Sequence, residues 1–325
     1  MIVEIKKTLG RCFFYWRRSF SSSPPYIVTW CNGSTRDFDS CGRSSNLLVT
    51  ANYKGRKGVS FLCSDFDMIV HQFPNNNDIT VIPVSDVHLG ALEHYAEEWK
   101  SFCKKIENSP NTYILLLGDL LNNSIRNSVA NPFDEVMRPR EQKKIMVEQL
   151  KPIKDKILCS VSGNHERRTM KDSDVDLSYD IMAKLDIEHL YRENIAFLKI
   201  QVGKRPSEDK ANCSYMFGVT HGAGGGIYTG ASVNRNERFG YLIEGIDCLV
   251  VGHTHKGTIS RPSKIVVNPF ADKVTLRPFT VISAESWLNY GGYAAQKMLL
   301  PSESGNPQKI KLSGKLHDKK IEVLW

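Results

Sequence analysis

Five short hydrophobic runs in the sequence each end at a residue whose side chain can bind a metal ion. The runs cover residues 79–85, 113–118, 157–163, 215–220 and 248–252. The residues that follow them are, in order, Asp86 and His88, then Asp119, then Asn164 and His165, then His221, and finally His253 and His255. Short runs rich in β-branched residues are typical of buried strands. Because ligands of sheet proteins gather beyond the carboxyl ends of the strands, the pattern predicts a metal site at one edge of a sheet.

The sequence between the runs predicts helices. Residues 93–108 place four apolar residues at helical spacing with charges elsewhere, which is typical of an amphipathic helix; they are Trp99, Phe102, Cys103 and Ile106. A helix between the first two runs predicts a βαβ crossover with parallel pairing of these strands. Residues 140–150, which Pro152 ends, and residues 178–185 predict two further helices. Strand-like runs return at 264–267, 274–283, 309–312 and 320–324.

The first 75 residues differ from the rest of the chain. Turn signals at 32–34, 42–45 and 54–58 separate short stretches such as 47–53 and 59–63. We therefore expect a β-rich N-terminal extension over residues 1–75 and an α/β domain over residues 76–325. The basic and aromatic opening of the chain favours a packed first strand or a loose terminus over a targeting segment.

The composition is that of an ordinary globular protein, with 41% hydrophobic and 24% charged residues. No apolar stretch approaches the roughly 20 residues that span a bilayer, so no membrane partner is expected. The eight cysteines are scattered without a C-x-x-C pair, which argues against a zinc finger or a disulfide framework and favours a cytoplasmic location. The net charge of +8 favours an anionic partner, such as a phosphorylated substrate or a nucleic acid.

Single blocks of this pattern are common, and an isolated histidine or aspartate is more often structural. In an extended segment, however, residues two apart share one face, so Asp86 and His88 can reach one ion, as can His253 and His255. Histidine is also the commonest metal ligand. In the block at 163–166 we expect Gly163 to permit an unusual backbone conformation that places the side chains after it.

Together and in this order, the blocks D-x-H, G-D, G-N-H-E, H and G-H-x-H resemble the signature of the calcineurin-like metallophosphoesterase superfamily. They span residues 86–255 and so cover neither the N-terminal extension nor the strand-like C-terminal part. The resemblance implies that residues 76–325 form a metallophosphoesterase domain. The fold that it implies is a four-layer α/β/β/α sandwich, in which two mixed sheets pack face to face with helices outside and metals at one edge.

The resemblance also implies two divalent metal ions, for which manganese, iron and zinc all suit the available side chains. The residues implied for one ion are Asp86, His88 and His255. The residues implied for the other are Asn164, His221 and His253. Asp119 would bridge the two ions, and a hydroxide that the metals generate from water would attack the phosphorus.

His165 and Glu166 are the residues that the resemblance implies for catalysis. His165 would lie beside the substrate, where it stabilises charge or protonates the leaving oxygen, and Glu166 would orient it through a hydrogen bond. Glu166 stands where many phosphodiesterase branches have aspartate. The Ser/Thr protein phosphatase branch carries glutamate there but also an Asp-Arg-Gly motif after the G-D block, which residues 120–124 lack. The pattern therefore favours the broader phosphoesterase class.

The leading hypothesis is a dinuclear phosphoesterase that hydrolyses a phosphodiester or a phosphomonoester. The alternatives are a DNA or RNA nuclease of the same superfamily and a non-catalytic metal-binding scaffold. The arginines near the motif loops are candidates for phosphate contacts; they are Arg126, Arg167, Arg168, Arg235 and Arg238. The aromatic residues that are candidates for stacking on a base are Trp287, Tyr290 and Tyr293.

Overall fold

The computed structural model describes residues 66–126, 128, 132–204, 212–316 and 319–325, and four strands among the first 65 residues. The chain divides into two compact units, Met1–Asp67 and Met68–Trp325. In the first unit, four strands form an antiparallel sheet in chain order. They are β1 (Ile2–Thr8), β2 (Arg11–Arg17), β3 (Tyr26–Thr29) and β4 (Val49–Thr50). The stretch expected at 59–63 lies outside the described residues.

The strand β5 (Ile69–Phe73) belongs to the second unit, although we expected the extension to reach residue 75. It pairs in parallel with β10 (Ile195–Val202) at the edge of a large sheet, and Ile69 is buried there. Residues 74–77 therefore form a turn that connects two strands of the same unit, β5 and the strand that begins at Asp78, and do not separate two domains. A turn and a linker share the same residue types, so the sequence alone does not distinguish them.

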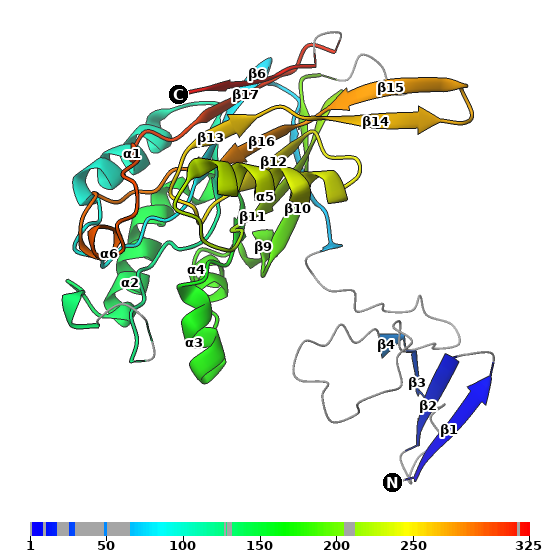
Figure 1. Cartoon of the computed structure of the whole chain (residues 1–325), viewed down its shortest axis with the longest axis horizontal. Helices are drawn as coiled ribbons and strands as arrows, with labels where there is room; N and C mark the ends of the chain where they lie inside the picture. The colour runs from blue at the N-terminus through cyan, green and yellow to red at the C-terminus, as the bar shows by residue number, and fades with distance from the viewer. Residues whose placement is uncertain are drawn as a thin grey trace. The chain divides into compact units, whose positions relative to one another are not determined.

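Two six-stranded sheets form the second unit (Figure 1). The first has the order β13-β16-β12-β11-β10-β5, and the second has the order β18-β17-β6-β7-β8-β9. Besides β5 and β10, the first contains β11 (Cys213–Thr220), β12 (Cys248–Val251), β13 (Thr258–Ser260) and β16 (Thr280–Ser283). The second contains β6 (Asp78–Val84), β7 (Thr112–Leu116), β8 (Ile157–Val161), β9 (Tyr191–Arg192), β17 (Lys309–Ser313) and β18 (Ile321–Leu324). Each sheet contains both parallel and antiparallel pairs.

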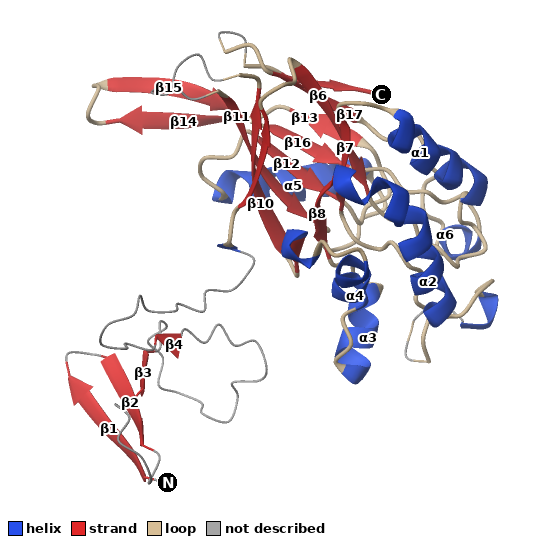
Figure 2. Cartoon of the chain, turned by 180° about the vertical axis from the view of Figure 1, so that it is seen from behind, coloured by secondary structure: helices blue, strands red, loops and turns tan. Residues whose placement is uncertain are grey.

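Helices cover the outer faces of both sheets, which confirms the four-layer α/β/β/α arrangement. On the second sheet lie α1 (Ala96–Asn108), α2 (Pro139–Leu150), α4 (Leu177–Lys184) and the short helix η3 (Lys151–Lys156), as Figure 2 shows from behind. The helix α5 (Thr229–Leu242) packs on β13 and β16 of the first sheet. The shorter helices are η2 (Pro132–Asp134), α3 (Glu166–Ser173), η4 (Glu188–Leu190) and α6 (Gly292–Gln296).

The five motif strands are divided between the two sheets. In the second sheet β6, β7 and β8 are parallel neighbours, and α1 forms the predicted crossover between β6 and β7. In the first sheet β11 and β12 are parallel neighbours. All four predicted apolar residues of α1 are buried. Because parallel neighbours end at the same edge, each sheet delivers its motif residues to one side.

The helix α5 was not predicted, because its buried face is not hydrophobic. The buried residues are Ser232, Asn236 and Gly240, spaced four apart. Gly240 lets the ring of Phe279 approach, since a Cβ there would lie 2.5 Å from that ring. Asn236 Nδ2 donates a hydrogen bond to Ser283 Oγ of β16 at 2.8 Å. Close packing and a hydrogen bond thus replace the apolar stripe by which a surface helix is normally recognised.

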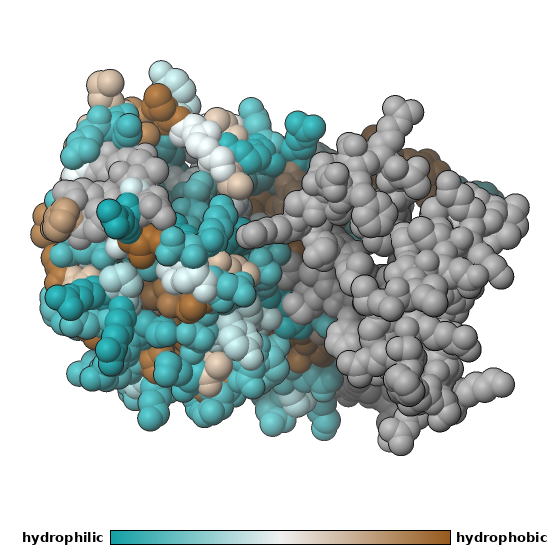
Figure 3. Space-filling model, turned by 90° about the horizontal axis from the view of Figure 1, so that it is seen from below, coloured by the Kyte–Doolittle hydropathy of each residue, from teal (hydrophilic) through white to brown (hydrophobic). Residues whose placement is uncertain are grey.

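The predicted run at 274–283 is two strands. Phe279 separates β15 (Lys273–Pro278) from β16, and β15 pairs with β14 (Ser263–Asn268) in a two-stranded ribbon that extends from the sheets (Figure 1). Hydrophilic residues predominate on the described part of the surface in Figure 3, where hydrophobic residues form small separate groups. No helix among the described residues is both long enough and apolar enough to cross a membrane.

Trp99 provides a test of the core beneath α1. It is fully buried, its ring lies 5.3 Å from that of Trp287, and its Nε1–H donates to Gln149 Oε1 at 2.9 Å. Trp99→Ala should therefore lower the free energy of unfolding by about 3–5 kcal/mol, measured by urea denaturation. Phe270→Ala is the control, because Phe270 is 98% exposed and should change this quantity by less than about 0.5 kcal/mol. Equal effects of the two substitutions would contradict the packing described for α1.

Candidate metal centre

Asp86, His88 and His255 form a first cluster at the carboxyl ends of β6 and β12. His255 Nε2 lies 3.0 Å from Asp86 Oδ1, and His88 Nε2 lies 3.7 Å from the same oxygen. The two imidazole nitrogens are 3.4 Å apart. Asp86 Oδ1 is buried and receives no well-directed hydrogen bond from the described residues. A carboxylate oxygen and two imidazole nitrogens thus converge on one point, and too few hydrogen-bond donors lie among them to satisfy all three. Such an arrangement fits a bound cation.

Asn164, His221 and His253 form a second cluster at the ends of β8, β11 and β12. Asn164 Oδ1 lies 2.9 Å from His221 Nε2 and 2.7 Å from His253 Nδ1, and these two nitrogens are 3.2 Å apart. His221 Nδ1 donates to the backbone oxygen of Leu117 at 2.7 Å, which leaves Nε2 facing the cluster. This contact orients the ring in the way that ligating histidines are usually held.

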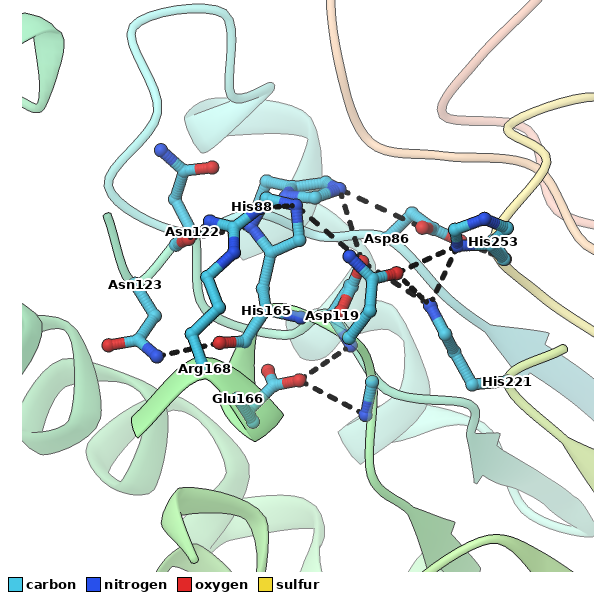
Figure 4. Close-up of polar contacts among 12 residues, drawn as sticks. Asp86, His88, Asp119, Asn122, Asn123, His165, Glu166, Arg168, His221 and His253 are labelled. Carbon is cyan, nitrogen blue, oxygen red and sulfur yellow. Dashed lines mark hydrogen bonds and ion pairs between the residues drawn. The ribbon is translucent and has the colours of Figure 1, made fainter. Parts of the chain in front are cut away.

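The carboxylate of Asp119 lies between the two clusters (Figure 4). Its Oδ2 is 3.3 Å from His221 Nε2 and 4.0 Å from His88 Nε2. Its Oδ1 accepts a hydrogen bond from the backbone N–H of His165 at 2.8 Å. The structure therefore brings together all seven side chains that the sequence predicts as ligands, with Asp119 in the middle.

The backbone of the motif loops is left-handed, contrary to the extended conformation that we expected for the D-x-H and H-x-H segments. The residues with positive φ are Asp86 (54°), His88 (48°), Asp119 (49°), His253 (70°) and His255 (56°). Such conformations cost non-glycine residues of order 1–3 kcal/mol each and cluster at functional sites.

Contacts between neighbouring loops hold these left-handed residues. The N–H groups of Asp86 and His88 donate to the carbonyl oxygens of Gly118 and Asp119, at 3.1 and 3.0 Å. The N–H of His253 donates to Asp86 Oδ2 at 2.8 Å. Each loop therefore takes its conformation from partners that are distant in the sequence, which is why the local pattern predicted it wrongly.

Gly163 is needed for close approach and does not adopt a positive φ, which corrects our expectation for this residue. A Cβ at this position would lie 2.1 Å from both the nitrogen and Oδ1 of Asp119. Gly252 has a similar role, because a Cβ there would lie 2.1 Å from Ser85 Oγ. The loop of Gly163 packs against the loop after β7, and there it is Gly118 that has a positive φ, of 85°.

Glu166 holds the loop of Asp119 and does not contact the ring of His165, contrary to the predicted hydrogen bond. Its carboxylate accepts hydrogen bonds from the backbone N–H groups of Asp119 at 3.0 Å, Leu121 at 2.9 Å and Gly163 at 3.2 Å. Burial, together with the negative charge of Asp119, raises the pKa of Glu166 to about 7. The residue therefore connects the loops after β7 and β8.

The ring of His165 is oriented by Asn122 and Arg168, neither of which belongs to the five motif blocks. His165 Nδ1 donates to the backbone oxygen of Asn122 at 2.6 Å, and Arg168 Nη2 lies 2.9 Å from His165 Nε2 (Figure 4). His165 Nε2 also lies 3.8 Å from Asp119 Oδ2. Burial lowers the pKa of His165 to about 3, so the ring is neutral and Nε2 accepts from the guanidinium. The only sequence signal for Arg168 was its proximity to the G-N-H-E block.

The candidate residues for substrate contact differ in whether their side chains are used in internal contacts or are exposed. Arg167 donates to the carbonyl oxygens of Ser162 and Glu193, and Arg235 donates to three carbonyl oxygens of the loop after His221. Trp287 is buried against Trp99 and cannot stack on a base, so this expectation was wrong. The exposed candidates are Arg126, Arg238 and Tyr290, and the side chain of Tyr293 lies outside the described residues.

The charges in the centre stabilise one another. Burial opposes ionisation of Asp86 and Asp119, but the neighbouring histidines outweigh it and hold both pKa values below the ordinary range. Burial alone would lower the pKa of His221, yet the charge of Asp119 and the hydrogen bond to it raise this pKa to about 9. Two ionised carboxylates with imidazole and amide ligands suit divalent transition metals.

The chain was compared with protein families and with solved structures. A family model described as calcineurin-like phosphoesterase matches residues 79–257. A metallophosphoesterase from Sphaerobacter thermophilus is similar over 72% of this chain and 84% of its own, with 15% identity and a TM-score of 0.33. A conserved uncharacterized protein of Streptococcus pneumoniae TIGR4, described as a predicted phosphoesterase, is similar over 76% of this chain and 87% of its own, with 11% identity and a TM-score of 0.33. The NAD nucleotidase of Haemophilus influenzae is similar over 76% of this chain and 49% of its own, with 11% identity and a TM-score of 0.31. No curated protein matches the sequence significantly.

The raised pKa of His221 predicts how metal binding depends on pH. Below about pH 9 the metal-free ring carries a proton that competes with a metal ion, so the affinity for Mn²⁺ should rise as the pH rises from about 6 to about 9. Binding at neutral pH should release protons, which calorimetric titration in buffers of different ionisation enthalpy measures directly. The pKa of His253 is lowered by burial, so this residue should contribute none of them. An affinity that stays constant over this range would contradict the electrostatics described for His221.

Proposed function

Because this chain belongs to the calcineurin-like phosphoesterase family, we propose that it hydrolyses a phosphodiester or a phosphomonoester at a pair of divalent metal ions. The observation that carries the proposal is the position of Asp119, whose Oδ2 faces an imidazole nitrogen of each cluster. A single carboxylate in this position can bind an ion on either side. When bound, two such ions supply Lewis acidity at the phosphoryl group and generate the attacking nucleophile from water.

The side chains present fit this pair of ions. The first ion would be held by Asp86, His88 and His255, among which Asp86 Oδ1 is buried without a well-directed donor. The second would be held by Asn164, His221 and His253, and Asp119 would be shared. Manganese, iron and zinc all accept this combination of oxygen and imidazole ligands.

His165 and Arg168 are the residues that we assign to the substrate. The Nε2 atom of His165 lies beside the shared carboxylate. Because this nitrogen carries no proton in the neutral ring, it has to take up a proton from the attacking water before it can pass one to the leaving oxygen. The guanidinium of Arg168 lies next to the same nitrogen and can bind phosphoryl oxygens through its paired N–H groups. Glu166 positions Asp119 by accepting hydrogen bonds from backbone N–H groups. Among the described residues, its carboxylate forms no hydrogen bond with His165 Nε2 or with the side chain of a proposed ligand.

The nuclease alternative is supported by the net charge of +8, which favours a polyanionic substrate. The scaffold alternative is disfavoured, since the site keeps the proposed catalytic residue His165 beside Asp119 as well as every proposed ligand. Hydrolysis of bis-p-nitrophenyl phosphate, p-nitrophenyl phosphate and labelled single-stranded DNA, with added manganese and after chelation, separates the three. Cleavage of the DNA selects the nuclease, and an inactive protein that binds both metals selects the scaffold.

Asp119→Asn tests the shared carboxylate. The substitution removes a negative charge that both clusters face, so it should reduce the content of both ions after dialysis, measured by elemental analysis of the purified protein. Asp155→Asn is the matched control, because Asp155 is exposed and distant from the motif loops. Loss of one ion with full retention of the other would show that Asp119 serves only one cluster.

His165→Ala tests the assignment on the substrate side. We expect the metal content to stay unchanged while turnover of bis-p-nitrophenyl phosphate falls by about 10²–10⁴-fold, the range typical of lost proton transfer. His189→Ala, in which an exposed histidine is removed, should keep full turnover. Undiminished activity of His165→Ala with both metals bound would refute the role given to this residue.

A further inference from the structure

A cavity of about 470 Å³ borders the first metal cluster. Lys256, on its wall, directly follows His255, and Ser302 on the same wall donates its Oγ–H to the backbone oxygen of His255 at 2.7 Å. Pockets for small organic ligands typically measure ~300–1,000 Å³. The cavity is therefore large enough for a ring system, and it lies within one residue of a proposed ligand.

The part of the wall that Glu285 forms is also connected to the first cluster. Glu285 lines the cavity directly after β16, in a segment held at both ends. The N–H of Ala284 donates to the carbonyl oxygen of Val251 at 2.8 Å, and the N–H of Trp287 donates to that of Asp86 at 3.0 Å. A ligand that fills the cavity would thus lie beside the segment that contacts Asp86.

The buried polar groups at the cavity are hydrogen-bond acceptors. Glu285 is only 4% exposed, and its Oε2 accepts one hydrogen bond, from the N–H of Asn306 at 3.3 Å. Gln308 does not line the cavity; it is fully buried beside Glu285, and its Oε1 has no donor among the described residues. The two side chains are neighbours, because a Cβ on Gly257 would lie 2.8 Å from both Gln308 Nε2 and Glu285 Cγ. At the cavity itself, a nearly buried carboxyl group that accepts one long hydrogen bond favours a ligand that supplies further N–H groups.

The rim of the cavity offers a flat aromatic surface. The ring of Trp325 reaches over Gly257, since a Cβ there would lie 2.5 Å from Trp325 Cη2. Half of Trp325 is exposed, and Leu300 adds an apolar contact on the same cavity. An exposed indole beside a buried carboxyl group can stack on a planar ring while that ring donates hydrogen bonds.

We propose that this cavity binds a nucleobase, with guanine as the best match, and thereby makes a nucleotide ester the substrate of the neighbouring metal centre. Guanine presents adjacent N–H donors on one edge and a planar face, which correspond to Glu285 and Trp325. The substrate assignment rests on the proposed phosphoesterase function, whereas binding of the base does not. The base would occupy the cavity while its phosphate lies at the clusters.

Calorimetric binding of guanosine, which carries no phosphate, to the full chain tests this proposal. Glu285→Gln keeps an acceptor for Asn306 but loses the charge, and Trp325→Leu removes the stacking surface. Each should weaken guanosine binding by about tenfold or more. Glu303→Gln is the matched control, because Glu303 lines the same cavity but is exposed, and it should leave the affinity unchanged.

Absence of saturable guanosine binding, or equal affinity of the wild type and both variants, would overturn the proposal. So would binding of choline in place of guanosine, weakened equally by Glu285→Gln and Glu303→Gln, since that marks a site for cations. Hydrolysis of bis-p-nitrophenyl phosphate, p-nitrophenyl phosphate and single-stranded DNA serves as the separate readout of the phosphoesterase function, and the control variant Glu303→Gln should retain the wild-type activity within about twofold. Guanosine binding with the expected pattern in a protein that binds metal but hydrolyses none of these three substrates would refute the phosphoesterase and leave the base site standing.

Discussion

The carboxylate of Glu166 accepts hydrogen bonds from three backbone N–H groups, and the geometry of the metal centre depends on these contacts. They hold the loop after β7 against the loop after β8, at a separation that only Gly163 permits. Asp119 is thereby held with its Oδ2 between two sets of imidazole nitrogens. A buried carboxylate without these donors would be costly, so the same contacts stabilise the fold and the centre together.

The two sheets contribute unequally to the centre. Three parallel strands of one sheet supply Asp86, His88, Asp119 and Asn164, whereas two parallel strands of the other supply His221, His253 and His255. The left-handed residues at the strand ends are held by hydrogen bonds between these loops, so the loops support one another. A rigid double sheet can maintain such strained positions, because its buried strands keep the loop ends fixed.

The surroundings of the clusters differ in chemistry. Beside His88 and Asp119, the pair of His165 and Arg168 offers a neutral imidazole and a fixed positive charge. Beside His255, the cavity of Glu285 and Trp325 offers acceptors and an aromatic surface. A phosphate ester has two parts that match these two surroundings: an anionic phosphoryl group that suits Arg168 and an organic group that suits the cavity.

The sequence by itself determined the side chains that form the candidate metal centre, the strands that carry them and three of the helices. These features are local: a hydrophobic run predicts its own strand, and the seven predicted ligands lie directly after such runs. The sequence also predicted the apolar face of α1, because all four of its buried residues recur at helical spacing.

Only the tertiary structure decided the left-handed loops, the close approach at Gly163, the partners of Glu166 and the polar packing of α5. It also identified Asn122 and the cavity of Glu285, and it singled out Arg168 among the five arginines that the sequence analysis named. Each of these depends on atoms far apart in the chain, such as Glu166 with Asp119 or Gly257 with Trp325. Periodicity and residue type report the local environment of a segment, whereas backbone strain and shared hydrogen bonds arise only when distant loops meet.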